Sequence, residues 1–116
     1  MNVQIFGVKK CSDTRKAERF FKERGIRFQF VDLTEKGLSK GELRSVAAKT
    51  QMEPLLDRSS PRFVAKGLTQ AWLDATKIES LLLEDPLLFR TPIVRNGKDA
   101  TVGYCPEVWK TWQSSN

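Results

Sequence analysis

Cys11 is the residue whose chemistry is easiest to name, and basic residues surround it. The stretch FGVKKCSDTRK places Lys9 and Lys10 before the thiol and Arg15 after it. An apolar run precedes Cys11 and a helical pattern follows it, so we expect the sulfur at the N-terminal end of a helix. The positive end of a helix dipole and nearby cations lower the pKa of a thiol. The pattern therefore indicates either a nucleophilic thiolate or a small residue that fits a turn.

The composition excludes several other kinds of site. The 116 residues include no histidine, so Cys–His and Ser–His catalytic pairs and imidazole-based zinc sites are excluded, and we expect no metal. The two cysteines, Cys11 and Cys105, are too few for a disulfide framework and form no C-x-x-C pair. No stretch is typical of a secretory signal or a membrane span. We therefore expect a cytoplasmic protein with two free thiols.

The net charge of +6 favours anionic ligands of any kind. Lysines and arginines are scattered along the chain and do not cluster with aromatic residues, which argues against nucleic acid as a partner. We expect a monomer without a membrane partner, in which the three tryptophans serve packing.

The elements around Cys11 predict a βαβ unit. Residues 3–6 form the pattern of a buried strand, and residues 13–24 that of a helix ended by Gly25. Residues 26–33 alternate apolar and polar side chains, which predicts a second strand, parallel to the first. Cys11 then lies at the carboxyl end of the first strand, where parallel sheets bind ligands.

The rest of the chain completes a thioredoxin-like α/β fold. Residues 91–104 predict an antiparallel hairpin with a type I′ turn at Asn96-Gly97, and a short helix follows. We expect one domain with a mixed four-stranded sheet and helices on both faces. Its core occupies about residues 1–35 and 87–113. Residues 36–86 form a helical insertion, in which capping boxes at Ser39 and Thr76 begin two helices.

Three features resemble the arsenate reductase (ArsC-like) family of thioredoxin-fold proteins, including its YffB-type and Spx-type branches. They are Cys11-x-x-x-Arg15 after the first strand, Arg58 in a turn-rich middle segment, and FRTPIV before the hairpin. The resemblance implies that Cys11 attacks arsenate, that Arg15 holds the oxyanion and helps to keep the thiol ionised, and that Arg58 steadies the anion. It also implies that Pro92 is a cis proline opposite the nucleophile.

The chain departs from this family at one position of the site. Oxyanion-reducing members carry an arginine directly before the proline, whereas Thr91 stands there and Arg90 comes one place earlier. A shift of one residue in a strand turns the side chain to the opposite face. We retain Arg90, Thr91 and Pro92 as candidate anion-binding residues, together with the hydroxyls of Ser12 and Thr14.

The resemblance implies that glutathione is a co-substrate and that glutaredoxin clears the mixed disulfide, with no tightly bound cofactor. Cys105 is a weaker candidate for a resolving thiol. The first hypothesis is therefore a glutathione-linked thiol oxidoreductase that reduces arsenate. The alternative is a redox-responsive regulator without turnover, resembling the branch that binds RNA polymerase. Those regulators carry C-x-x-C, whereas Thr14 stands three residues after Cys11. A relative without surviving chemistry is a third possibility.

Overall fold

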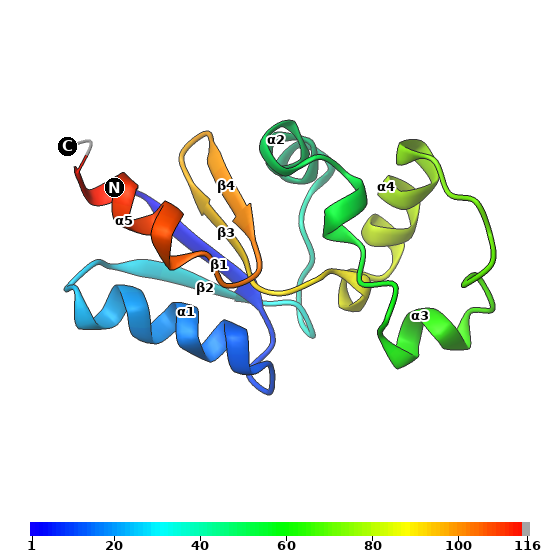
Figure 1. The fold of residues 1–116 in the computed structure, drawn as a ribbon, viewed down its shortest axis with the longest axis horizontal. Coiled ribbons are helices and arrows are strands. Elements are labelled where there is room, and N and C mark those ends of the chain that lie inside the picture. The colour runs from blue at the N-terminus through cyan, green and yellow to red at the C-terminus, as the bar shows by residue number, and fades with distance from the viewer. Residues whose placement is uncertain (115–116) are drawn as a thin grey trace.

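The computed structural model describes residues 1–114, which build one mixed sheet with helices on both sides (Figure 1). The strands are β1 (Val3–Gly7), β2 (Phe28–Asp32), β3 (Ile93–Asn96) and β4 (Asp99–Val102). The α-helices are α1 (Ser12–Glu23), α2 (Lys40–Thr50), α3 (Pro61–Ala65), α4 (Ala75–Glu84) and α5 (Pro106–Ser114). Two 3-10 helices, η1 (Glu53–Leu55) and η2 (Pro86–Leu88), complete the chain.

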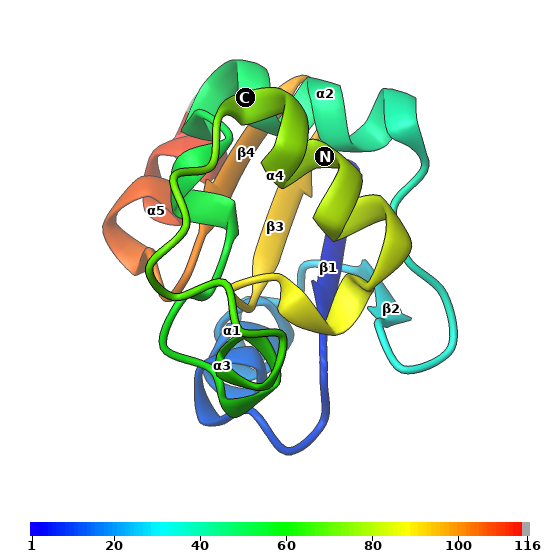
Figure 2. The same ribbon diagram turned by 90° about the vertical axis from the view of Figure 1, so that its right-hand side faces the viewer.

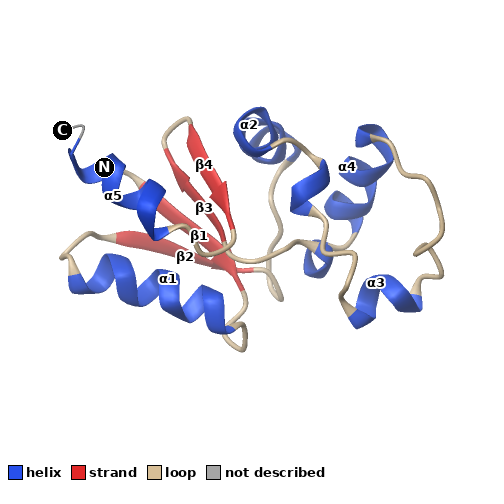
Figure 3. Cartoon of the chain, viewed as in Figure 1, coloured by secondary structure: helices blue, strands red, loops and turns tan. Residues whose placement is uncertain are grey.

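The sheet has the order β2-β1-β3-β4, and Figure 3 shows its strands in red. β1 pairs with β2 in parallel and with β3 antiparallel, and β3 pairs antiparallel with β4. The order of elements is βαβ, then helices, then ββα. The prediction of a thioredoxin-like mixed four-stranded sheet is therefore confirmed.

The pleat of β1 divides the core between two faces of the sheet. Val3 and Ile5 point to one face, where they pack with Phe21 of α1 and Trp109 of α5. Phe6 points to the other face and joins the cluster formed by α2, α4 and the short helices. Successive residues of a strand point to opposite sides, so one five-residue strand supports both cores.

Helix α1 follows from the spacing of its apolar residues. Ala17, Phe20 and Phe21 are buried, and their spacing of three and four residues places them on one face of a helix. The helix ends at Glu23, and Gly25 follows with φ of +67°, a conformation that glycine adopts without steric cost. Helix α1 therefore runs from the residue after Cys11 to the turn at Gly25.

The segment between β2 and β3 packs against one end of the sheet, with α3 and α4 nearest the viewer in Figure 2. The capping box at Ser39 is confirmed, because Ser39 Oγ accepts from Glu42 N and Glu42 Oε1 accepts from Ser39 N. The prediction of a second capping box, at Thr76, is wrong. Asp74 caps α4 by accepting from Lys77 N at 2.9 Å. A carboxylate is as good a cap as a threonine and complements the helix dipole.

The hairpin forms where the sequence predicts it, but its turn type differs. Asn96 pairs with Asp99, so Gly97 and Lys98 are the central residues of the turn. Among these residues only Gly97 has a positive φ, of 61°. A type II′ turn requires a positive φ at its first central position, where this chain has glycine. The expected type I′ turn is therefore replaced by the pattern of a type II′ turn.

Within residues 1–114, none of the helices is long and apolar enough to cross a membrane.

Candidate active site

Cys11 lies at the carboxyl end of β1 and is the N-cap residue of α1. Its backbone is extended, with φ of −77° and ψ of 120°, and its carbonyl accepts the first helical hydrogen bond from Arg15 N at 3.1 Å. The thiol is half-buried, and its sulfur lies near the backbone N–H groups of Asp13 and Thr14 in the first turn of α1. The sulfur therefore faces the helix start.

Thr91, which lies shortly before β3, contacts the sulfur of Cys11. Its Oγ1 donates a hydrogen bond to Cys11 Sγ at 3.1 Å, and its carbonyl oxygen lies 3.8 Å from the same sulfur. The Thr91–Pro92 peptide bond is cis, as expected from the resemblance. Two residues that are 80 positions apart in the chain thus meet at one atom.

The pKa of Cys11 is lower than the ordinary value of a cysteine. Burial of the sulfur raises this pKa, but hydrogen bonds from the side chains of Thr14 and Thr91 and from the backbone N–H groups of Thr14 and Asp13 outweigh it. Donors that stabilise a thiolate lower its pKa. The expected direction is therefore correct, although hydroxyl and amide donors produce it, and the expected cations Lys9, Lys10 and Arg15 are not among its causes.

The hydroxyl of Thr14 lies beside the Cys11 sulfur, although not in ideal hydrogen-bond geometry. The side chain of Thr14 is fully buried, and within residues 1–114 its Oγ1 has no hydrogen-bond partner of standard geometry. A buried hydroxyl without a partner is costly, and a thiolate beside it would relieve that cost. Thr14 packs against Gly7, where a Cβ atom would lie 2.5 Å from Thr14 Oγ1. The glycine at the end of β1 therefore makes room for the hydroxyl beside Cys11.

Cys11 and Thr91 open into a cavity of about 580 Å³, a size typical of small-molecule sites. Its walls come from the loop after β1, the loop after β2, the start of α3 and η2. Most of the wall is apolar, from residues Val8, Leu33, Pro61, Pro86, Leu87 and Phe89. The polar part consists of Lys10, Thr34, Asp57, Ser60 and Arg62.

Arg62 lies in the cavity wall, and its charge is already paired. Its Nε lies 2.6 Å from Asp85 Oδ2, and Lys66 Nζ lies 3.7 Å from the same oxygen. Burial raises the pKa of Asp85, but the Arg62 hydrogen bond leads the interactions that lower it below its usual value. Arg62 and Asp85 are 23 residues apart, so local sequence patterns carry no signal for this pair.

Of the eight candidate residues, Cys11 and Thr91 line this cavity, and besides Thr14 and Pro92 four others do not. Arg58 forms a two-point pair with Glu53, at 2.7 and 3.1 Å. Arg90 is exposed, and its backbone N–H donates to Leu55 O. Ser12 is exposed on the first turn of α1.

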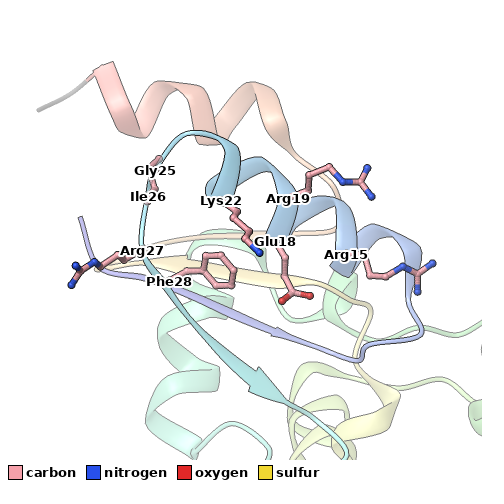
Figure 4. Close-up of a pocket in the computed structure, with 8 residues that line it drawn as sticks. All are labelled: Arg15, Glu18, Arg19, Lys22, Gly25, Ile26, Arg27 and Phe28. Atoms are coloured by element: carbon pink, nitrogen blue, oxygen red, sulfur yellow. The ribbon is translucent and has the colours of Figure 1, made fainter.

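The fourth residue, Arg15, contacts the loop before Cys11. Its Nη1 donates to Lys9 O at 2.8 Å. Arg15 also lines a wider groove of about 840 Å³ between α1 and the start of β2, which Figure 4 shows. That groove contains no cysteine, so the smaller cavity beside Cys11 is the candidate active site.

Cys105 belongs to a different part of the molecule. Its Sγ donates to Val102 O at 3.3 Å, and the residue packs against the aromatic cluster of α1 and α5. Burial raises the pKa of this thiol. It does not line the cavity of Cys11, so we expect resolution of a Cys11 adduct to need an external thiol. Within residues 1–114 there is no cluster of three His, Cys, Asp or Glu residues that could hold a metal.

Comparisons with known proteins agree with this geometry. The model of the ArsC family matches residues 6–112. The Global transcriptional regulator Spx 2 of Oceanobacillus iheyensis is 31% identical over 106 residues, covering 90% of this chain and 78% of that protein.

Two solved structures share the fold. An arsenate reductase (ArsC) related protein from Brucella melitensis is 25% identical, with a TM-score of 0.69 over 97% of this chain and 95% of that one. The arsenate reductase from Vibrio cholerae is 23% identical, with a TM-score of 0.80 over 93% and 94%. At this identity, the second comparison supports the fold alone.

Proposed function

Since this chain belongs to the ArsC family, we propose that it is a glutathione-linked thiol oxidoreductase whose nucleophile is Cys11. The observation that carries the proposal is the half-buried sulfur that accepts a hydrogen bond from Thr91 at the edge of a 580 Å³ cavity. A low-pKa, accessible thiol at a helix start is the kind of cysteine that attacks disulfides.

The reaction that fits is exchange on a mixed disulfide between glutathione and a second thiol. The Cys11 thiolate attacks the glutathionyl sulfur, the S–S bond breaks, and the second thiol leaves as a thiolate that takes a proton from water. A free glutathione thiolate then attacks the glutathionyl sulfur on Cys11. This step releases oxidised glutathione and restores the Cys11 thiolate. The exchange requires free glutathione, which the cytoplasm supplies.

The walls of the cavity favour an organic substrate over arsenate. Six of the residues that line it are apolar, and its arginine, Arg62, is paired with Asp85. Asp57 adds a carboxylate to the same wall. We expect a small inorganic anion to bind weakly in such surroundings. Of the two cations in the cavity wall, Arg62 is paired, and Lys10 alone makes no ion pair within residues 1–114. Arsenate reduction, with glutaredoxin as the clearing partner, is therefore the second reaction to test.

The direct experiment measures glutathione-dependent reduction of a glutathionylated peptide. We expect Cys11→Ser to lower turnover by about a thousandfold or more, because removing the nucleophile of such a reaction removes its covalent step. Cys105→Ser is the matched control and retains turnover. Full activity of Cys11→Ser would contradict the proposal. Replacing the peptide with arsenate and glutaredoxin in the same assay separates the two substrates.

A regulator without turnover is the second candidate, because the relative from Oceanobacillus iheyensis is named a global transcriptional regulator. In this role Cys11 would sense oxidants and change the binding of a partner such as RNA polymerase. A pull-down with the polymerase, before and after oxidation of Cys11, tests this role. Oxidation-dependent binding together with no turnover on either substrate would favour the regulator.

A further inference from the structure

The groove between α1 and the start of β2 is separate from the Cys11 cavity and carries an unusual charge. Figure 4 shows Lys22 and Glu18 on the side of α1 that faces β2, with Phe28 beneath them. Arg19 lies on the same helix, and Arg27 lies directly before β2 with its side chain directed away from α1. Basic residues of α1 and the residue before β2 therefore border one hollow with a partly apolar floor.

The cations of this groove lack acidic partners. Glu18 is engaged by Lys9 at 3.3 Å, so it does not neutralise the residues beside it. Within residues 1–114, Arg19, Lys22 and Arg27 form no ion pair. Unpaired cations that line one groove attract an anionic partner.

The second property of the groove is the free edge of β2. In the order β2-β1-β3-β4, β2 pairs with β1 on one side and with no described strand on the other. A strand edge presents unpaired N–H and C=O groups, which an extended peptide can pair with. β2 contains no proline that would prevent this.

We propose that this groove binds an acidic segment of a partner protein, in extended conformation along the free edge of β2. The cations supply the attraction for glutamates and aspartates, and the strand edge supplies pairing for the amide backbone. β2 has five residues, so about 16 Å of extended chain would lie along it.

Two other occupants fit these features less well. A second copy of the chain carries the same net charge of +6, and its basic groove would repel this one. A nucleic acid has the required negative charge, but its phosphate backbone has no amide groups to pair with β2. The acidic polypeptide is the occupant that uses both features.

The test measures binding of a fluorescent peptide of about ten alternating glutamates and valines to the whole protein. We expect binding that weakens with salt, because the attraction is between exposed charges. The triple variant Arg19→Glu, Lys22→Glu, Arg27→Glu should lose about tenfold or more in affinity, since each reversal replaces an attraction with a repulsion.

A matched control separates the groove from the total charge. Lys36→Glu, Lys49→Glu, Lys98→Glu changes the net charge equally at exposed positions outside the groove, and should keep most of the affinity. Equal loss in the two triple variants would overturn the groove as the site. Unfolding curves and the alkylation rate of Cys11 check that both variants are folded.

Two further probes test the type of partner. A peptide of alternating glutamate and proline has the same charge but fewer N–H groups, so we expect it to bind about tenfold more weakly. Equal affinity of the two peptides would overturn pairing along β2. Tighter binding of an oligothymidylate of equal charge would overturn the protein segment as the occupant.

Discussion

Cys11 and Cys105 have a similar exposure and a similar position before a helix, yet the pKa values of their thiols are shifted in opposite directions. Both are half-buried, and both stand directly before a helix. Cys11 Sγ accepts a hydrogen bond from Thr91 Oγ1 and donates one to Thr91 O, and Cys105 Sγ likewise donates one to Val102 O. The pKa of Cys11 is lowered and that of Cys105 is raised by burial. Neither exposure nor a helix start therefore sets the pKa of a thiol alone. Donors from Thr14, Thr91 and Asp13 outweigh burial at Cys11, whereas the Thr101 side chain does not outweigh it at Cys105.

The surroundings of the two thiols also serve different purposes. Cys105 packs against an aromatic cluster that includes Trp109, and the cluster stabilises the fold. Cys11 lies beside a cavity, with the buried hydroxyl of Thr14 next to it. Substitutions near Cys105 should therefore affect mainly the stability of the fold, and substitutions near Cys11 mainly the chemistry that we propose for it.

The largest expected effect is on stability, near Cys105. Trp109 is fully buried, and its Nε1 donates to Thr101 Oγ1 at 2.8 Å. We expect Trp109→Ala to lower the free energy of unfolding by about 3–5 kcal/mol, through the cavity and the lost hydrogen bond. Urea denaturation measures this change. Cys11→Ser, measured in the same way, should change stability by about 1 kcal/mol or less.

The next largest effect is a rise of the Cys11 pKa toward that of Cys105. Thr91→Val and Thr14→Val each remove a hydroxyl that favours the thiolate. We expect the pKa of Cys11 to rise by up to about one unit in each variant, because one hydrogen bond contributes about 0.5–1.5 kcal/mol. The pH dependence of alkylation measures it. An unchanged pKa in both variants would show that hydroxyl donors do not control the thiol.

A smaller effect concerns the charges in the cavity wall. Asp85→Asn keeps an acceptor near Leu87 N but removes the charge that neutralises Arg62 and Lys66. We expect arsenate to protect Cys11 from alkylation about threefold better in this variant, since exposed ion pairs are worth up to about 1 kcal/mol. Glu79→Gln is the control, because it frees Arg44 outside the cavity. Equal protection in wild type and Asp85→Asn would contradict this account of the wall.

The smallest effect is expected at Arg58, the residue that the family resemblance assigns to anion binding. Its guanidinium is held by Glu53 and does not line the cavity. Arg58→Gln should therefore leave the protection by arsenate and the pKa of Cys11 unchanged. A loss of protection would mean that Arg58 leaves Glu53 and reaches the anion when one binds.

Much of the fold could be predicted because its signals are local. The apolar spacing of α1, the capping box at Ser39 and the Asn96-Gly97 hairpin each depend on a few neighbouring residues. The errors are also local. Asp74 competes with Thr76 as the cap of α4, and a shift of one residue in the hairpin changes its turn type.

The candidate site could be predicted only in part. The sequence singled out Cys11, Thr14 and Thr91, and the structure brings them together. It could not show that Arg62 lines the cavity or that Asp85 neutralises it. The sequence could not show either that the cations beside β2 are unpaired, because charge pairing depends on contacts between residues far apart in the chain.

The most direct test of the central claim is a comparison of the two thiols in one assay. Alkylation rates are measured against pH for Cys105→Ser, which retains Cys11, and for Cys11→Ser, which retains Cys105. Only thiolates react, so the midpoint of each curve reports the pKa of the remaining cysteine. We predict a midpoint for Cys11 below that of an ordinary cysteine and a midpoint for Cys105 above it. A Cys11 midpoint equal to or higher than that of Cys105 would contradict the assignment of Cys11 as the nucleophile.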